Sequence, residues 1–246
     1  MTLSGSLSAS TDRLRQDRGL IEQLIDDPTP LGPDFAPVKS LSDGSLVAYK
    51  ATGRGQRGTD LDTGLSLLSS AQSNGLMERL DWAFRCLALD VAVDHGMTAE
   101  LHLTPEPETF GTMCPPRLAT SFGRGRRVIK VDAEVHAAAF ATTTLEGMAN
   151  EWRGLGWRII VADVSELYDR EFLSRLSQLH PDVVQVDLNK PRRESDPGVL
   201  GILNWAKGAG VEIHALGVDN ELRREQAMDL GATAGRGWYY GAPAPL

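Results

Sequence analysis

Apolar and polar residues along most of the chain follow a pattern that predicts short strands separated by helices. Runs rich in β-branched residues predict strands at Leu46 to Ala51, Glu100 to Leu103, Arg127 to Val131, Trp157 to Val161, Asp182 to Val186 and Val211 to Ala215. Between most of these runs apolar residues recur at helical spacing, most clearly at Leu76, Leu80, Phe84, Leu87 and Val91. Strands that alternate with helices predict βαβ units, and therefore a parallel sheet or barrel with right-handed crossovers.

The first part of the chain, residues 1–34, is predicted to be an extension of the main domain. Thr11 to Asp27 mixes apolar residues with charges in a pattern that predicts a short amphipathic helix, and the prolines between Pro28 and Pro33 end it. Residues 35–246 show no linker and match the usual length of a one-domain β/α barrel. The apolar face of the helix is expected either to pack on its own barrel or to pair with another chain.

Composition and charge narrow the classes of function. The net charge of −8 and the pI near 5.2 disfavour a general nucleic-acid binder, because phosphate backbones favour clustered Lys and Arg. Cys86 and Cys114 have no metal-binding spacing, and no apolar run approaches a membrane span or a signal peptide. We therefore expect a soluble cytoplasmic protein with no membrane partner.

Polar residues at the predicted strand ends are the candidate chemistry. Sites in β/α barrels and in open parallel sheets lie at the carboxyl ends of strands. Residues two apart share a strand face, so Asp132 is expected beside Lys130, and Asp187 beside Gln185. The strand-end residues that the apolar pattern does not require are Lys50, His102, Lys130, Asp132, Asp163, Gln185, Asp187 and His214.

Several segments, in the same order along the chain, resemble the EAL domains, a family of cyclic di-GMP phosphodiesterases. Phe35-Ala36-Pro37-Val38 and Val47-Ala48-Tyr49-Lys50-Ala51 resemble the family's opening strand and its E-A-L signature. Ala215-Leu216-Gly217-Val218-Asp219-Asn220 is similar to the A-E-G-V-E-T run, and Arg236-Gly237-Trp238-Tyr239-Tyr240-Gly241-Ala242-Pro243 is similar to the Q-G-Y-Y-F-G-x-P terminus. The resemblance implies an α/β fold, a modified TIM-type (β/α)8 barrel.

The same resemblance implies that the metal-binding residues of the family are replaced. Family members cut cyclic di-GMP with divalent metal ions held by carboxylates and an amide, ligands that Mg²⁺ and Mn²⁺ favour. Carried over by position, the family's ligands and its lysine correspond here to Lys50, His102, Lys130, Ala162, Gln185 and Leu216, while Asp163, Asp187 and Asp219 keep carboxylates. We therefore expect no bound metal, no cofactor and no hydrolysis.

Two functions remain open. In the first, the barrel is a regulatory module that binds a protein partner, either a regulator or a second copy of itself. In the second, it is a metal-free receptor for cyclic di-GMP or a related cyclic dinucleotide, with candidate ligand-binding residues Lys50, Arg54, His102, Lys130, Asp163, Asp187, Asp219 and Arg236. If Lys50 and Lys130 pair with Asp163, Asp187 or Asp132, the mouth is neutralised internally; if Arg54 and Arg236 join them, it can hold a phosphate.

A glycine motif offers a competing interpretation. Gly53-Arg54-Gly55-Gln56-Arg57-Gly58 fits the dinucleotide-binding pattern G-x-G-x-x-G and follows a predicted strand. That pattern requires an immediate helix, whereas a polar loop from Thr59 to Thr63 follows here. The motif is therefore interpreted as a loop, in which the resemblance gives Arg54 a ligand-contacting role.

Overall fold

The strands of the computed structural model form a closed barrel in sequence order. The structure describes residues 3–137, 145–164, 170–190 and 197–246. The strands are β1 (Asp34–Ser40), β2 (Leu46–Thr52), β3 (Glu100–Leu103), β4 (Val131–His136), β5 (Arg158–Ala162), β6 (Val183–Asp187), β7 (Glu212–Leu216) and β8 (Ala234–Arg236). β1 is antiparallel to both of its neighbours, and the other pairs are parallel. The predicted α/β barrel of modified TIM type is confirmed.

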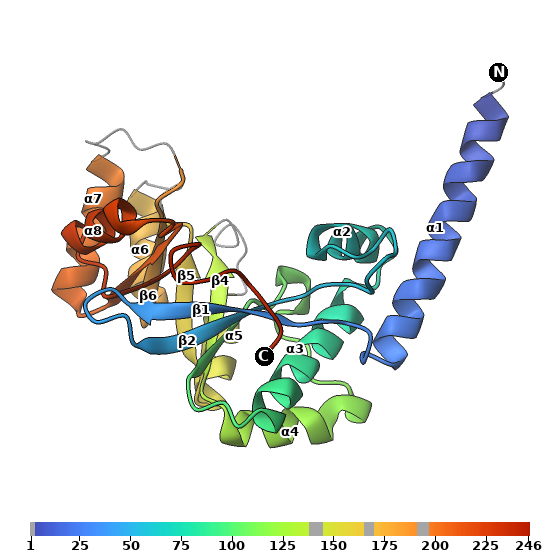
Figure 1. Cartoon of the computed structure of the whole chain (residues 1–246), viewed down its shortest axis with the longest axis horizontal. Coiled ribbons are helices and arrows are strands. Elements are labelled where there is room, and N and C mark those ends of the chain that lie inside the picture. The colour runs from blue at the N-terminus through green and yellow to red at the C-terminus, as the bar shows by residue number, and fades with distance from the viewer. Residues whose placement is uncertain (1–2, 138–144, 165–169, 191–196) are drawn as a thin grey trace.

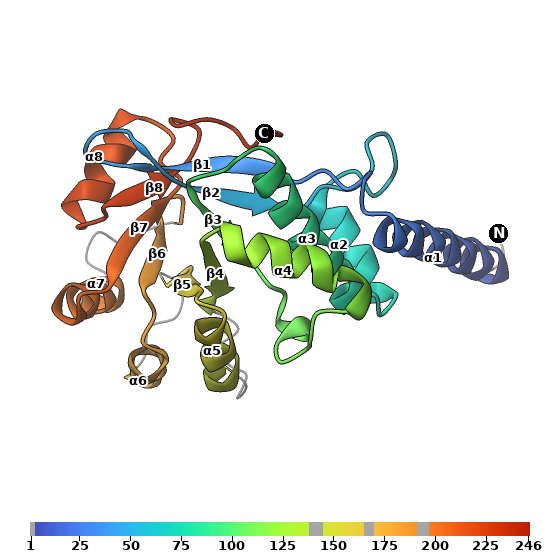
Figure 2. The same cartoon turned by 90° about the horizontal axis from the view of Figure 1, so that it is seen from below.

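The helices surround this barrel and extend it at one side. Helices α5, α6 and α7 lie outside β4 to β7, and α2 to α4 lie on another side (Figure 2). Their bounds are α1 (Leu3–Asp26), α2 (Gly64–Ser73), α3 (Met77–Asp94), α4 (Ala119–Val128), α5 (Leu145–Gly154), α6 (Arg170–Leu179), α7 (Pro197–Ala209) and α8 (Glu221–Asp229), with short 3-10 turns η1 (Pro107–Thr109) and η2 (Pro116–Leu118). No described helix has the length and apolar character needed to cross a bilayer.

The N-terminal helix is longer than the sequence predicts. It begins at Leu3 instead of Thr11 and projects away from the barrel beyond α2 (Figure 1). Near its end, Ile21, Leu24 and Ile25 are buried in a small core with leucines of α2 and α3. The final turns of α1 therefore pack on the protein's own domain, one of the two outcomes expected for its apolar face.

Local sequence signals place the ends of two helices beside the barrel. Thr63 caps α2, because its hydroxyl oxygen accepts a hydrogen bond from the amide of Ser66. Asn220 caps α8 in the same way through the amide of Arg223, and Gly231 follows α8 with φ +88°, as expected for a C′ glycine. These caps fix α2 and α8 at the carboxyl ends of β2 and β7.

The predicted strand at Arg127 to Val131 is misplaced. Helix α4 continues to Val128. Strand β4 begins only at Val131 and extends to His136. Gly125 allows α4 to cross α3 closely, since a Cβ atom at that position would lie 2.5 Å from Cβ of Leu89. The β-branched Val128 and Ile129 thus belong to the end of the helix and its cap, where tertiary packing overrides β-propensity.

Candidate functional site

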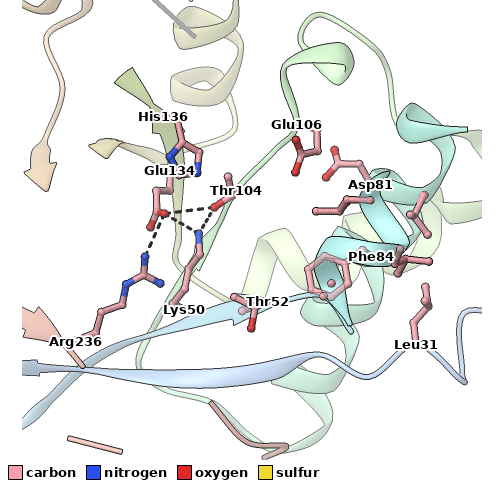
Figure 3. Close-up of a pocket in the computed structure, with 16 residues that line it drawn as sticks. Leu31, Lys50, Thr52, Asp81, Phe84, Thr104, Glu106, Glu134, His136 and Arg236 are labelled. Atoms are coloured by element: carbon pink, nitrogen blue, oxygen red, sulfur yellow. Dashed lines mark hydrogen bonds and ion pairs between the residues drawn. The ribbon is translucent and has the colours of Figure 1, made fainter. Parts of the chain in front are cut away.

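A pocket opens at the carboxyl ends of β2, β3 and β4, against α2 and α3. Its volume is about 370 Å³, and Leu31, Leu67, Leu68, Leu80 and Phe84 make one wall apolar. Lys50, Thr104, Glu134, His136 and Arg236 form the barrel side, and Asp81 and Glu106 lie across from them (Figure 3). A pocket of this size, with an apolar wall and a few convergent polar groups, is typical of a small-molecule site.

A buried ion-pair cluster forms the floor of the pocket on the barrel side. Nζ of Lys50 lies 3.0 Å from Oε1 of Glu134, and Nη2 of Arg236 lies 3.5 Å from the same oxygen. Lys50 also donates to Oγ1 of Thr104 (Figure 3), and Nε2 of Gln185 lies 3.3 Å from Oε2 of Glu134. We call Lys50, Glu134 and Arg236 the barrel-mouth triad. It holds two cations around one carboxylate.

The pKa values within the triad reflect burial and mutual charge. Burial of Lys50 lowers the pKa of its ammonium group to about 8, although Glu134 opposes that shift. Burial also disfavours the ionised form of Glu134, but Lys50 and Arg236 outweigh it and hold the pKa of this carboxyl well below its usual range. At neutral pH Glu134 is therefore ionised, and Lys50 is mostly protonated because its pKa of about 8 lies only slightly above neutrality.

The opposite side of the pocket is acidic. Asp81 is buried on α3 and lies 2.7 Å from Nη2 of Arg85, whose guanidinium stacks 3.8 Å from the ring centroid of Trp82. Burial raises the pKa of Asp81, and burial together with the neighbouring Asp81 raises that of Glu106. This side of the pocket thus disfavours a second negative charge.

A histidine and an aspartate lie at the rim of the barrel. Nδ1 of His136 lies 3.6 Å from Oδ2 of Asp163, which is also 3.3 Å from Nζ of Lys190. The contact with Asp163 raises the pKa of His136, and the same contact lowers the pKa of Asp163 despite partial burial. Asp163 has φ 61°, an uncommon conformation for a residue other than glycine, at the end of β5.

The glycine-rich segment is a packed loop. Gly55 leaves no room for a side chain, because a Cβ atom there would lie 1.7 Å from the carbonyl oxygen of Leu61. Arg54 lies 3.2 Å from Asp34 and 3.9 Å from Asp62, and its backbone pairs with Gly32. The glycine spacing is therefore explained by loop packing, and Arg54 is held by two acids instead of lining the pocket.

The position of Lys130 differs from the one that the sequence predicts. It is exposed and precedes β4, at the opposite end of that strand from the pocket, so the hypothesis that it points into the mouth is wrong. The cause is the misplaced strand: β4 starts at Val131, and its pocket-lining residues are Glu134 and His136. Lys50 pairs with Glu134 and not with the predicted Asp163, Asp187 or Asp132.

His102 is buried inside the barrel and does not line the pocket. Its side chain has no exposed surface; Nε2 lies 3.5 Å from Asp132, and the ring stacks on His214 at 6.1 Å between centroids. Burial lowers the pKa of His102 well below its usual value. Thr104, two positions after His102 in the sequence, instead reaches the triad from the end of β3.

The remaining candidates lie around the rim. Asp187 accepts a hydrogen bond from the amide of Asn189, and Asp219 accepts one from the amide of Trp238. Of the eight candidate ligand-binding residues, the pocket brings together two, Lys50 and Arg236. The other six are Arg54, His102, Lys130, Asp163, Asp187 and Asp219.

The sequence interpretation missed Glu134, the carboxylate at the centre of the triad. Its signal was the alternation of Asp132, Glu134 and His136, three polar residues on one strand face in an otherwise apolar run. Among the residues that the structure describes, no group of three or more histidine, cysteine, aspartate or glutamate side chains is arranged to hold a metal ion. Glu134 is instead bound by cations of the protein itself.

Comparison with known proteins identifies the fold. No family model matches the chain, and no curated protein matches it. Among solved structures, it is similar to the FimX EAL domain of Xanthomonas citri in complex with c-di-GMP, with TM-score 0.81, 14% identity and 97% of each chain covered.

Two further solved structures are similar to this chain. The PaMucR phosphodiesterase in its c-di-GMP complex gives TM-score 0.69 at 20% identity, covering 88% of this chain and 97% of that one. An EAL-domain protein from Listeria monocytogenes gives TM-score 0.70 at 14% identity, covering 93% of this chain and 92% of that one. The barrel described above therefore has the fold of EAL domains.

Proposed function

We propose that this protein is an EAL-fold regulatory protein that does not hydrolyse cyclic di-GMP and acts by binding a protein partner. The barrel-mouth triad is the observation that carries the proposal. Lys50 stands where the resemblance places a metal-binding glutamate, and its ammonium group lies 3.0 Å from Glu134. Glu134, the carboxylate beside that position, is thus paired with a cation of the protein itself.

Electrostatics disfavours a metal ion at Glu134. A dication and a monovalent cation 4 Å apart repel each other by about 8 kcal/mol at an effective dielectric of 20. Lys50, with a pKa of about 8, can lose its proton at neutral pH at a small cost in free energy. The guanidinium of Arg236 also faces Glu134, so repulsion remains even when Lys50 is neutral. This supports an EAL fold without metal-dependent chemistry.

The paired cations also disfavour a phosphate ligand. The triad holds one cation more than acids, but both cations already contact Glu134, and Asp81 and Glu106 line the opposite side of the pocket. Glu134 contacts Lys50 and Arg236, and Arg54 is held between Asp34 and Asp62. A cyclic dinucleotide would have to break these pairs or bind beside them, which supports a protein partner over a nucleotide.

The projecting part of α1 supplies a surface for such a partner. Figures 1 and 2 show the first half of this helix extending beyond α2, with no other described element beside it. In the sequence Leu7 and Leu14 lie about two helical turns apart there, among polar and small residues. A helix that extends past its own domain can pair with a second copy of the chain or with a regulator.

A second function, metal-free binding of cyclic di-GMP, is favoured by one feature. The 370 Å³ pocket combines Phe84 and other apolar residues with Lys50 and Arg236. The FimX and PaMucR structures of the same fold contain c-di-GMP. The two functions therefore differ in whether this pocket takes a nucleotide while the triad stays intact.

Calorimetric titration with cyclic di-GMP in the presence of chelator separates the two functions. We expect no binding at micromolar concentrations, with an EAL domain that binds c-di-GMP, such as that of FimX, as the positive control. Micromolar binding without metal would replace the partner proposal with the receptor. Light scattering of the full chain over a range of concentrations tests self-association; a monomer throughout, with no stoichiometric partner in native cells, counts against the proposal.

A further inference from the structure

The only two cysteines of the chain meet at one turn beside the pocket. Cys86 lies on α3, and Cys114 lies in the connection between β3 and α4. Sγ of Cys86 lies 3.9 Å from the carbonyl oxygen of Leu118, and Sγ of Cys114 lies 3.7 Å from that of Pro115. The amide of Leu118 donates to the carbonyl of Pro115 at 2.8 Å, so both sulfurs contact the same single turn.

The two thiols also interact with each other. Each thiol affects the pKa of the other, and neither is part of a disulfide. Cys86 is buried, whereas Cys114 is partly exposed and accessible to a small reagent. The fold thus brings together two residues that are far apart in the sequence.

The connection that carries Cys114 also forms part of the pocket. Thr104 and Glu106 line the pocket, and further along the connection Oγ1 of Thr112 accepts a hydrogen bond from Nε1 of Trp82 on α3 at 2.9 Å. Turns η1 and η2 of this connection both pack against α3. A covalent link between α3 and Cys114 would therefore fix the segment that holds this wall of the pocket.

We infer that Cys86 and Cys114 form an intramolecular disulfide when the protein meets a small-molecule disulfide as oxidant. The thiolate of Cys114, the accessible sulfur, attacks the reagent, forms a mixed disulfide and releases one thiol. Cys86 then attacks the sulfur of Cys114, gives up its proton to the departing thiolate and releases the second thiol. One reagent disulfide is reduced to two thiols while two cysteines are oxidised to one cystine.

Burial sets the rate of this exchange. It raises the pKa of both thiols, and for Cys86 the neighbouring Cys114 adds to the shift. Since the thiolate is the attacking species, the reaction should be slow near neutral pH and accelerate as the pH rises. Such behaviour suits a site that responds to sustained oxidation.

The test treats the full-length native protein with an excess of oxidised glutathione. We expect the free thiols, counted after denaturation, to fall from two to none, and peptide mapping without reductant to give one Cys86–Cys114 cross-linked peptide from a monomer. The midpoint of thermal unfolding should rise by about 5 to 10 °C, as for a disulfide closing a ring of this length. Hydrogen exchange in the connection that carries Cys114 should slow.

The variant Cys114→Ser is the matched control, because it keeps the buried thiol and removes its partner. Under the same oxidant its unfolding midpoint should not rise. The inference is overturned if two thiols persist under conditions that oxidise free dithiothreitol, or if the products are only glutathione adducts or intermolecular dimers. A cross-link without any rise in the midpoint would refute the claim that it fixes the connection to α3.

Discussion

The substitution Glu134→Gln tests whether the barrel-mouth triad holds the barrel together by charge. Glutamine keeps the size and the hydrogen-bonding oxygen of Glu134 but leaves Lys50 and Arg236 without their shared carboxylate. Removing one partner of a buried ion pair costs about 3 to 5 kcal/mol, because the remaining charge stays desolvated. We expect a loss of this size in the free energy of unfolding, measured by urea titration at pH 7.

A double-mutant cycle with Lys50→Met assigns that loss to the pair. At 3.0 Å the direct attraction between Lys50 and Glu134 is about 5 kcal/mol at an effective dielectric of 20, before desolvation is subtracted. Lys50→Met alone should cost about 1 to 2 kcal/mol, since Arg236 still contacts Glu134. The double variant should be more stable than the sum of the single losses implies, by about 2 kcal/mol.

Glu22→Gln is the matched control for the same chemical change. Glu22 forms an exposed ion pair with Arg18 on α1 at 3.1 Å, and its loss should cost no more than about 0.5 kcal/mol. If Glu134→Gln destabilises the protein by less than about 1 kcal/mol with an unchanged urea slope, the triad does not act as described. A coupling energy near zero between Lys50 and Glu134 in the double-mutant cycle would likewise contradict the described role of the triad.

Two further substitutions test other parts of the barrel. Burial raises the pKa of Asp132 from 3.8 to about 7, so between these values the native state binds the proton more tightly and stability falls as pH rises. Asp132→Asn should therefore gain about 1 to 3 kcal/mol relative to the unmodified protein at pH 8, and little at pH 4; equal pH profiles in urea titrations would refute this. Gly55→Ala should lower the free energy of unfolding by more than about 2 kcal/mol, because its Cβ would meet the carbonyl oxygen of Leu61. A Cβ atom at Gly147, an exposed position of α5, would have nothing within 4 Å, so Gly147→Ala should be neutral or stabilising. Similar thermal midpoints for both variants would contradict the packing of this loop.

The barrel could be predicted from sequence because its signals are local and repeated. Alternating strand and helix patterns, the C′ glycine at Gly231 and the opening and closing segments around Lys50 and Arg236 all point to one architecture. The strand predicted at Val128 and Ile129 was wrong. A close contact of Gly125 with α3 fixes α4 there, and these two residues form the end of α4 and its cap. That contact depends on residues distant in the sequence, which a local pattern does not contain.

The site was predicted only in part for the same reason. Lys50 and Arg236, both candidates from the sequence, line one pocket, but the misplaced β4 predicted Lys130 at the mouth where the structure has Glu134. A shift of a strand by a few residues changes which side chains reach the mouth. The length of α1 was also underestimated, because its first residues are small and polar and lack an apolar pattern.

Incubation of the purified protein with cyclic di-GMP tests the central proposal most directly. The nucleotide is analysed by chromatography after incubation with Mg²⁺ or Mn²⁺, and in parallel with chelator. We predict no linear dinucleotide above the level of a protein-free control in any of these conditions, because Lys50 and Arg236 occupy the carboxylate of Glu134. Linear product that appears with the metal ion and disappears with chelator would contradict the proposal.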